Sequence, residues 1–272
     1  MNDIYWNNRI EHAKQEGEPH RVAYDVSLEQ WTQIQETHRQ ILQRWIKSGS
    51  RLLDAGCGDG SLVGILPSQD LAYTGVDTSR VIVNYAGHQH PRRRFTYSFS
   101  LQRLPFHDDE FDLAVCRSLD GTVKDHQGFA VWRKIETELL RVAGRLLVLG
   151  YGEPDVYRVS DSLKSPEEFN CNAIMLAKGL GRLVYRPGQD GTCELYDLIV
   201  EEDQRRKGLG SRLVRELESL VQGTIYGFTR RSNVKAQAFY VSRGFSLYPA
   251  PGLYRGEDGV MFVKQRFPGD PK

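Results

Sequence analysis

The sequence predicts two α/β domains of unequal build, a doubly wound parallel sheet followed by a smaller mixed sheet. Three observations support this prediction. Between residues 51 and 149, short apolar segments alternate with segments of helical periodicity, which is typical of a parallel sheet covered by helices. Residues 151–168 are rich in Gly, Pro and Ser, the composition of a linker. Beyond them, apolar segments follow one another around a turn at 187–191, which indicates antiparallel strands.

The first domain is expected to begin with helices over residues 1–50. Between Leu28 and Trp45 apolar residues recur at helical spacing, which gives one apolar stripe. Ser27 and Gln30 have the spacing of a capping box at its start. The strands that follow are expected at 51–54, 72–77, 94–99, 111–116 and 145–149, with helices at 61–66, 79–86 and 128–141.

The second domain is expected to follow a different order of elements. Its strands are predicted at 173–177, 181–186, 194–200 and 224–229, its helices at 209–221 and 235–243, and a terminal strand pair near 252–254 and 260–265. The predicted boundaries are 1–152 for the first domain, 153–168 for the linker and 169–272 for the second domain.

Composition and charge limit the possible classes of protein. The chain has 272 residues, of which 40% are hydrophobic and 26% charged, which is ordinary for a globular protein. The net charge of +1 does not support nucleic acid as a partner, although clusters such as Arg92-Arg93-Arg94 leave a local contact open. The sequence has no run of about 18 apolar residues, so it predicts no membrane-spanning helix. The four cysteines lack metal-ligand spacing, so no metal site is predicted. Residues 1–6 lack the charged and apolar regions of a signal peptide, so we expect a cytoplasmic protein.

A glycine-rich turn follows the first predicted strand. The segment reads Asp54-Ala55-Gly56-Cys57-Gly58-Asp59-Gly60, directly after Leu52-Leu53. Glycines there let the backbone turn tightly and approach a ligand closely. The next predicted strand ends at Asp77, whose carboxylate can accept hydrogen bonds from both ribose hydroxyls of a nucleoside. The expected cofactor contacts here are Asp54, Gly56, Cys57, Gly58, Gly60 and Asp77.

Residues 50–150 resemble the class I S-adenosylmethionine-dependent methyltransferases. The matching segments are 53–60, Gly75-Val76-Asp77-Thr78-Ser79, Leu104-Pro105-Phe106 with Phe111-Asp112, and 138–142. The resemblance implies S-adenosylmethionine as cofactor, with the glycine turn on its methionine part and Asp77 on its ribose. Many members carry an acidic residue near the adenine, where this chain has Ser100 and Leu101. We expect these two residues at the adenine.

The acceptor motif of the DNA-base methyltransferases is missing from the expected place. After the fourth predicted strand the chain reads Val115-Cys116-Arg117-Ser118-Leu119. This is neither the D/N-P-P-Y/F sequence of amino-methylating members nor the Pro-Cys of those that methylate cytosine C5. A catalytically silent methyltransferase fold therefore stays open as an alternative.

A second cofactor motif follows the apolar segment 195–200. It reads Arg205-Arg206-Lys207-Gly208-Leu209-Gly210-Ser211 and opens a predicted helix. The N–H groups and positive dipole end of a helix N-terminus bind pyrophosphate. Further along, Asn233 suits the N-cap of a second helix, which closes at Gly244-Phe245.

Residues 170–267 resemble the GNAT superfamily of N-acetyltransferases. Both signatures, R/Q-x-x-G-x-G/A and N-x-x-A-x-x-F-Y-x-x-x-G-F, are matched at 205–210 and 233–245. The resemblance implies a short GNAT α+β domain with a mixed sheet after the Rossmann-like sheet, and acetyl-CoA as cofactor. The residues expected to contact it are Leu198, Ile199, Val200, Arg205, Arg206, Lys207, Gly208, Leu209, Gly210, Ser211 and Asn233.

Two residues are candidates for proton transfer in this domain. The resemblance places Tyr240 where many members carry the acid that protonates the leaving thiolate. Counted back from Gly208, Glu194 falls where histone-acetylating members carry their base, which would take a proton from the ammonium. The period of a strand puts Glu194, Tyr196, Leu198 and Val200 on one face. A core tyrosine and an exposed strand glutamate are the alternative interpretations.

These motifs together predict a bifunctional transferase. It would combine an acetyl-CoA-dependent N-acetyltransferase with an S-adenosylmethionine-dependent methyltransferase, acting on a small-molecule or peptide amine. The alternative is a single-activity N-acetyltransferase that uses a silent methyltransferase fold to bind its acceptor, a modified nucleobase being one such acceptor.

Overall fold

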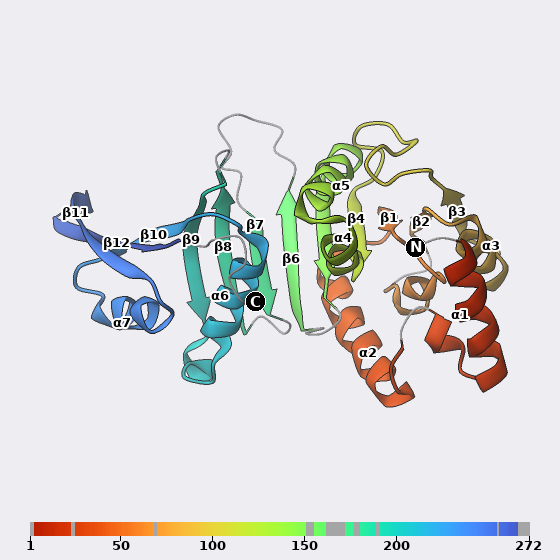
Figure 1. Cartoon of the computed structure of the whole chain (residues 1–272), viewed down its shortest axis with the longest axis horizontal. Helices are drawn as coiled ribbons and strands as arrows, with labels where there is room; N and C mark the ends of the chain where they lie inside the picture. The colour runs from red at the N-terminus through yellow and green to blue at the C-terminus, as the bar shows by residue number, and fades with distance from the viewer. Residues whose placement is uncertain are drawn as a thin grey trace. The chain divides into compact units, whose positions relative to one another are not determined.

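The chain divides into two compact units, Met1–Ser165 and Pro166–Lys272. The computed structural model (Figure 1) describes residues 3–22, 25–67, 70–150, 155–161, 172–176, 180–188, 191–254 and 256–265. Within these ranges, no helix combines the length and the apolar character needed to cross a membrane.

The first unit is built on a mainly parallel sheet. Its strands are β1 (Arg51–Ala55), β2 (Ala72–Asp77), β3 (Arg94–Tyr97), β4 (Leu113–Arg117), β5 (Arg145–Leu149) and β6 (Val156–Asp161), in the order β6-β5-β4-β1-β2-β3. The strands β1 to β5 are parallel, as predicted, because β1 pairs with both β2 and β4 in parallel register. The strand order reverses beside β1, and ligands of such sheets bind at the carboxyl ends of the strands at that point.

Helices of the first unit pack around this sheet. They are α1 (Asp3–Glu16), α2 (Leu28–Trp45), α3 (Arg80–Gln89), α4 (Leu119–Gln127) and α5 (Phe129–Val142), with 3₁₀ turns η1 (Pro19–Val22) and η2 (Ser61–Ile65). The apolar stripe of α2 buries Ile34, Ile41 and Leu42, and the predicted capping box is confirmed because Gln30 N donates to Ser27 Oγ over 3.2 Å. The main core lies between α5 and the sheet, with Trp132 and Leu139 fully buried.

The predicted linker is wrong over residues Val156–Asp161. These residues form β6, which pairs antiparallel with β5. Val156, Tyr157 and Val159 are buried, so this segment completes the apolar sheet instead of crossing solvent. The Gly, Pro and Ser residues around this segment led to the linker prediction, although the segment itself is apolar at Val156, Tyr157 and Val159. The other linker positions, except Asp155, lie outside the described residues.

The second unit contains the predicted mixed sheet. Its strands are β7 (Asn172–Leu176), β8 (Gly181–Pro187), β9 (Cys193–Val200), β10 (Ile225–Arg230), β11 (Ser246–Tyr254) and β12 (Glu257–Lys264), in the order β11-β12-β10-β9-β8-β7. The pair β9–β10 is parallel and the other described pairs are antiparallel. The remaining elements are η4 (Glu202–Gln204), α6 (Leu209–Leu220) and α7 (Val234–Ser242).

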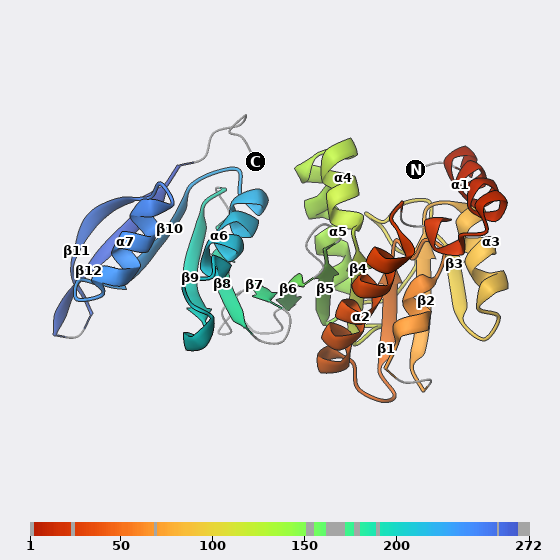
Figure 2. The same cartoon turned by 90° about the horizontal axis from the view of Figure 1, so that it is seen from below.

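Both helices of the second unit lie on one side of its sheet (Figure 2). A Cβ atom added at Gly210 of α6 would lie 3.5 Å from the Phe239 ring of α7, so the helices approach closely at the start of α6. The apolar face of α6 buries Leu213, Val214 and Leu217. The start of α6 is thus fixed beside the carboxyl end of β9.

Candidate cofactor sites

The glycine turn after β1 has the backbone that its sequence predicts. Gly56, Gly58 and Gly60 have φ values of 68°, 52° and 79°, in the left-handed region that favours glycine. Gly56 N and Cys57 N both donate to Val76 O, over 2.8 and 3.0 Å. The turn is therefore held against the end of β2.

Asp77 lies where the sequence places it, at the end of β2 beside this turn. Its side chain accepts hydrogen bonds from Gly58 N at Oδ2 over 3.2 Å and from Ser79 N at Oδ1 over 3.1 Å. Burial raises the pKa of Asp77, and these two N–H donors partly oppose that effect. The carboxylate is thus held at a fixed orientation.

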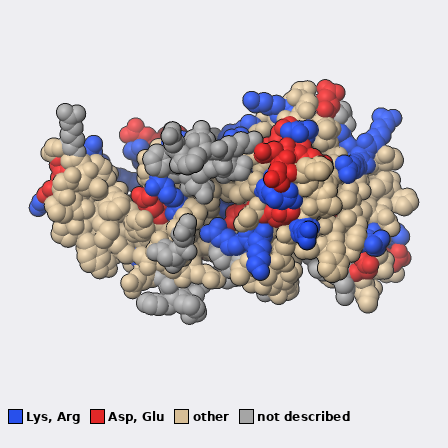
Figure 3. All heavy atoms as spheres, turned by 90° about the horizontal axis from the view of Figure 1, so that it is seen from above, with Lys and Arg blue, Asp and Glu red and all other residues tan. Residues whose placement is uncertain are grey.

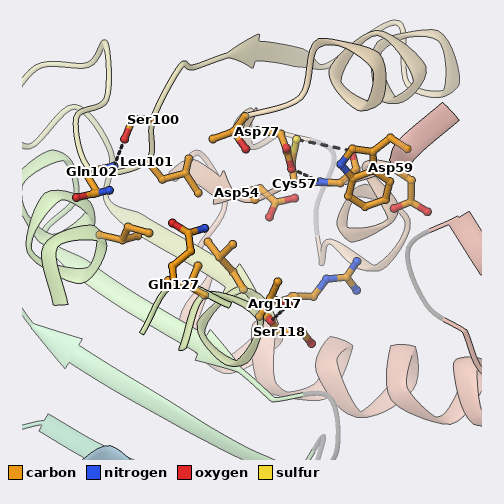
Figure 4. Close-up of a pocket in the computed structure, with 18 of the residues that line it drawn as sticks. Asp54, Cys57, Asp59, Asp77, Ser100, Leu101, Gln102, Arg117, Ser118 and Gln127 are labelled. Carbon is orange, nitrogen blue, oxygen red and sulfur yellow. Dashed lines mark hydrogen bonds between the residues drawn. The ribbon is translucent and has the colours of Figure 1, made fainter. Parts of the chain in front are cut away.

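A cavity of about 400 Å³ opens at the carboxyl ends of β1, β2 and β4 (Figure 4). It collects nearly all the predicted contacts of the first domain. Of the contacts predicted for the first domain, Gly60 alone does not line the cavity. The N–H of Gly60 donates to Cys57 O over 3.0 Å. The predicted residues that line the cavity are Asp54, Gly56, Cys57, Gly58, Asp77, Ser100 and Leu101.

The carboxylate of Asp54 is buried at the base of this cavity. Tyr73 donates its hydroxyl hydrogen bond to Asp54 Oδ2 over 2.7 Å. Burial raises the pKa of Asp54 to about 6, and the positive charge of Arg117 and the Tyr73 hydrogen bond partly oppose this. A cationic group of a ligand would therefore find a carboxylate here at neutral pH.

Arg117 is the lining residue of most interest that the sequence motifs missed. It ends β4 and is 8% exposed. Its Nη1 donates to Gln35 Oε1 of α2 over 2.8 Å, and its Nη2 donates to Ser61 Oγ over 2.5 Å. The next residue, Ser118, has a φ of 58°, which is uncommon for a residue other than glycine. No signal in the sequence of β4 gives the direction of this side chain.

In the second unit, β9 and β10 separate soon after they begin. Among the described residues they pair at Cys193–Ile225 and Glu194–Tyr226. The register of β9 against β8 then shifts, because Tyr185 pairs with Leu195 while its neighbour Val184 pairs with Asp197. Tyr196 is the extra residue of this β-bulge, which bends the strand. The backbone of Leu198, Ile199 and Val200, the predicted pantetheine contacts, lies beyond this separation.

The bulge makes one sequence prediction wrong. Glu194, Tyr196, Leu198 and Val200 do not share a face, because one extra residue reverses the alternation of the strand. The register instead places Glu194, Asp197 and Ile199 on the same face. Glu194 forms an ion pair with Arg186 over 3.0 Å, and Asp197 one with Arg182 over 3.3 Å. Asp197 is therefore a second carboxylate on this face, which sequence spacing missed.

The loop before α6 has the form of an anion site. Gly208 is the N-cap of α6, with a φ of 80° and no side-chain cap, and Leu209, Gly210 and Ser211 follow it. Arg205 Nε donates to Val200 O over 3.1 Å and Lys207 Nζ to Gln204 Oε1 over 3.1 Å. Arg206 has a φ of 64°. The side chain of Arg205 and the N–H groups at the start of α6 thus lie beside the end of β9.

The two predicted residues on α7 differ in their surroundings. Asn233 is the N-cap, because its side chain accepts from Ala236 N over 3.2 Å. Tyr240 is 6% exposed, and its ring stacks on Phe262 with 3.7 Å between ring centroids. Burial raises the pKa of Tyr240, and the negative charge of Asp197 adds to this. The phenol therefore keeps its proton at neutral pH.

Two family models match the chain, in the order that the motifs predict. A model described as a methyltransferase domain matches residues 53–143. A model described as the acetyltransferase (GNAT) family matches residues 125–245. The family models therefore find a methyltransferase domain followed by a GNAT acetyltransferase domain, which is the predicted order. The GNAT match begins in α4, so it overlaps the end of the methyltransferase domain. A search of the curated proteins found no match.

Solved structures of both kinds are similar to parts of the chain. An IAA acetyltransferase from Bacillus cereus ATCC 14579 has 17% identity and a TM-score of 0.33, over 35% of this chain and 77% of that one. The ribosomal-protein-S18-alanine N-acetyltransferase from Escherichia coli has 20% identity and a TM-score of 0.33, over 40% and 76%. A geranyl diphosphate methyltransferase has 15% identity and a TM-score of 0.35, over 42% and 44%. Similarity at this level carries no information on activity or substrate.

Proposed function

We propose that the chain is a bifunctional transferase that uses S-adenosylmethionine in its first domain and acetyl-CoA in its second. The observation that carries this proposal is that each domain joins its sequence motif to a matching site. In the methyltransferase domain the glycine turn, Asp54 and Asp77 line one cavity. In the GNAT domain β9 separates from β10 beside the uncapped start of α6.

The residues of the first cavity fit S-adenosylmethionine. Asp77 would accept hydrogen bonds from the ribose hydroxyls, and the buried Asp54 would face the ammonium of the methionine part. Ser100 and Leu101 would lie at the adenine; Ser100 Oγ accepts from Gln102 N over 3.1 Å, which holds this loop. The bound cofactor would supply an electrophilic methyl group. The residues of the chain bind and orient it.

In the GNAT domain, Glu194 and Tyr240 would move protons during acyl transfer. Bound acetyl-CoA would supply the acetyl group for an acceptor amine, with its thiolate as the leaving group. Glu194 would take the proton of the ammonium, directly or through water, and Tyr240 would give its proton to the leaving thiolate. The acceptor is a small-molecule or peptide amine. Figure 3 shows basic and acidic side chains intermixed on the face it displays, which, like the net charge of +1, gives no support for nucleic acid.

The second candidate function is a single-activity N-acetyltransferase with a silent methyltransferase fold that binds the acceptor. The observation that favours it is the end of β4, where Arg117 and Ser118 stand in place of an acceptor motif. Titration calorimetry of the whole chain with each cofactor separately distinguishes the two functions. Binding of both ligands supports the bifunctional transferase. Binding of acetyl-CoA without S-adenosylmethionine supports the silent fold, and binding of neither contradicts both proposals.

The affinity for S-adenosylmethionine is expected to fall in acid. The carboxylate of Asp54 has a pKa of about 6 in the cavity, with Arg117, Tyr73, Asp59 and Asp77 as its charged or titratable neighbours. A bound ammonium favours the ionised form of Asp54. Below pH 6 the carboxyl group is mostly protonated in the free protein, so binding must also release its proton. The dissociation constant should rise by up to about tenfold per pH unit below 6.

Calorimetry at pH 5 to 7.5 measures this dependence. Asp54→Asn cannot ionise, so its affinity should be weaker and nearly flat over the same range. An unmutated protein whose affinity does not change with pH would contradict the assignment of Asp54 to the ammonium.

Glu194 and Asp197, the two carboxylates on the same face of β9, can be compared directly. If Glu194 is the base, Glu194→Gln should lower kcat for acetyl transfer to a primary amine by about 10²–10⁴-fold, the range for a lost general base. Asp197→Asn breaks the ion pair with Arg182, just as Glu194→Gln breaks the one with Arg186. Asp197→Asn should change kcat far less. Acetyl-CoA affinity, followed by calorimetry, should be unchanged in both. The opposite order of the two effects would assign the proton transfer to Asp197.

A further inference from the structure

The first cavity has an uneven distribution of charge. Its described lining residues include three carboxylates, Asp54, Asp59 and Asp77, and one cation, Arg117. The arginine is 8% exposed. A cavity lined by both carboxylates and a guanidinium is suited to a ligand that carries a positive and a negative group.

The guanidinium of Arg117 is fixed at one end of this cavity. Its hydrogen bond to Ser61 Oγ holds it next to the glycine turn, since Ser61 directly follows Gly60. On the other side, Gln35 accepts from Nη1 over 2.8 Å and the Trp31 ring centroid lies 5.9 Å from Cζ. Figure 4 shows the side chain on the side of the cavity where Asp59 lies, across from Ser100 and Gln102.

Arg117 also lies within the electrostatic range of Asp54. Its charge is the largest of the effects that oppose the desolvation of that carboxylate. An α-amino acid carries its ammonium and its carboxylate on one carbon, so a site for it needs an anion and a cation close together. Asp54 and Arg117 supply this pair beside the glycine turn. A guanidinium has five N–H donors in a fixed plane, so it can hold neutral partners and a carboxylate together.

We propose that Arg117 binds the carboxylate of the methionine part of S-adenosylmethionine. This inference rests on the proposed cofactor of the methyltransferase domain. It gives the arginine at the end of β4 a role in cofactor binding, near the place where many DNA-base methyltransferases carry residues for the acceptor. It also links α2 to the cofactor, because Gln35 orients the guanidinium.

A pair of ligands that differ by one carboxylate tests this role. Calorimetry is carried out on the whole chain with S-adenosylmethionine, with decarboxylated S-adenosylmethionine and with 5′-methylthioadenosine, which lacks the amino-acid part. Arg117→Met should weaken S-adenosylmethionine by about 10- to 100-fold, the range for a lost hydrogen bond to a charged group. The affinities for the other two ligands should stay nearly unchanged. Arg94→Met, an exposed arginine of β3 outside the cavity, is the matched control and should change none of them.

The outcomes separate this inference from the proposed function. An equal loss for all three ligands would mean a structural role, and no loss for any would mean no contact; either overturns the proposal for Arg117 while S-adenosylmethionine binding by the unmutated chain stands. If the unmutated chain binds none of the ligands, the methyltransferase cofactor itself is overturned. If Arg117→Met does not fold, the unmutated chain still decides, because it should prefer S-adenosylmethionine over the decarboxylated ligand, and equal affinities would overturn the proposal.

Discussion

Replacing Gly208 with glutamate is expected to abolish measurable acetyl-CoA binding. Gly208 has a φ of 80° at the start of α6, and a Cβ atom there would meet no atom within 4 Å. The new side chain would therefore extend into open space beside the N–H groups of Leu209 and Gly210. It would place a negative charge where the phosphates of the cofactor are proposed to bind. Charge repulsion and steric block together should weaken binding by about 100-fold or more.

Calorimetry with acetyl-CoA measures this loss, and two variants separate its causes. Gly208→Ala introduces only the strain of a left-handed residue, about 1–2 kcal/mol, and should retain some binding. Ser219→Glu adds the same charge on an exposed position near the other end of α6 and should bind normally. Acetyl-CoA affinity that is unchanged in Gly208→Glu would remove the assignment of this loop to the cofactor phosphates.

The sheet of the first domain could be predicted because its strands are short apolar runs bounded by turn residues. The strands β2 and β5 have the predicted bounds, and β1 and β4 differ by one or two residues. The helix α4 was missed. Its sequence, Leu-Asp-Gly-Thr-Val-Lys-Asp-His-Gln, contains glycine and few apolar residues, so it has little helical periodicity to detect. Packing against α5 and β4 forms it.

The site could be predicted only where motifs carry a backbone requirement. The glycine turn and the carboxylate of Asp77 follow from local sequence, and the structure brings them to one cavity. The β-bulge at Tyr196 does not, because a bulge is a mismatch between two strands and β9 alone has no sign of it. Arg117 is similar: its role depends on α2, whose Gln35 is 82 residues away in the sequence.

Replacing Asp77 with alanine is expected to weaken every ligand that contains the ribose. The lost interaction is a hydrogen bond to a charged group, which contributes about 1.5–3 kcal/mol, or about 10- to 150-fold in affinity. Both S-adenosylmethionine and 5′-methylthioadenosine should lose affinity, because both carry the ribose. This pattern differs from that of Arg117→Met, where only the ligand with a carboxylate should be affected.

Calorimetry with both ligands measures the effect, and Asp77→Asn is the control for shape. The asparagine carbonyl oxygen can still accept from Gly58 N or Ser79 N, which donate to Asp77 over 3.2 and 3.1 Å. Its affinity should therefore fall less than that of Asp77→Ala, and its thermal unfolding should stay closer to that of the unmutated chain. Unchanged binding of both ligands by a folded Asp77→Ala protein would show that the ribose does not lie at the end of β2, and the methyltransferase site would then need another orientation of its cofactor.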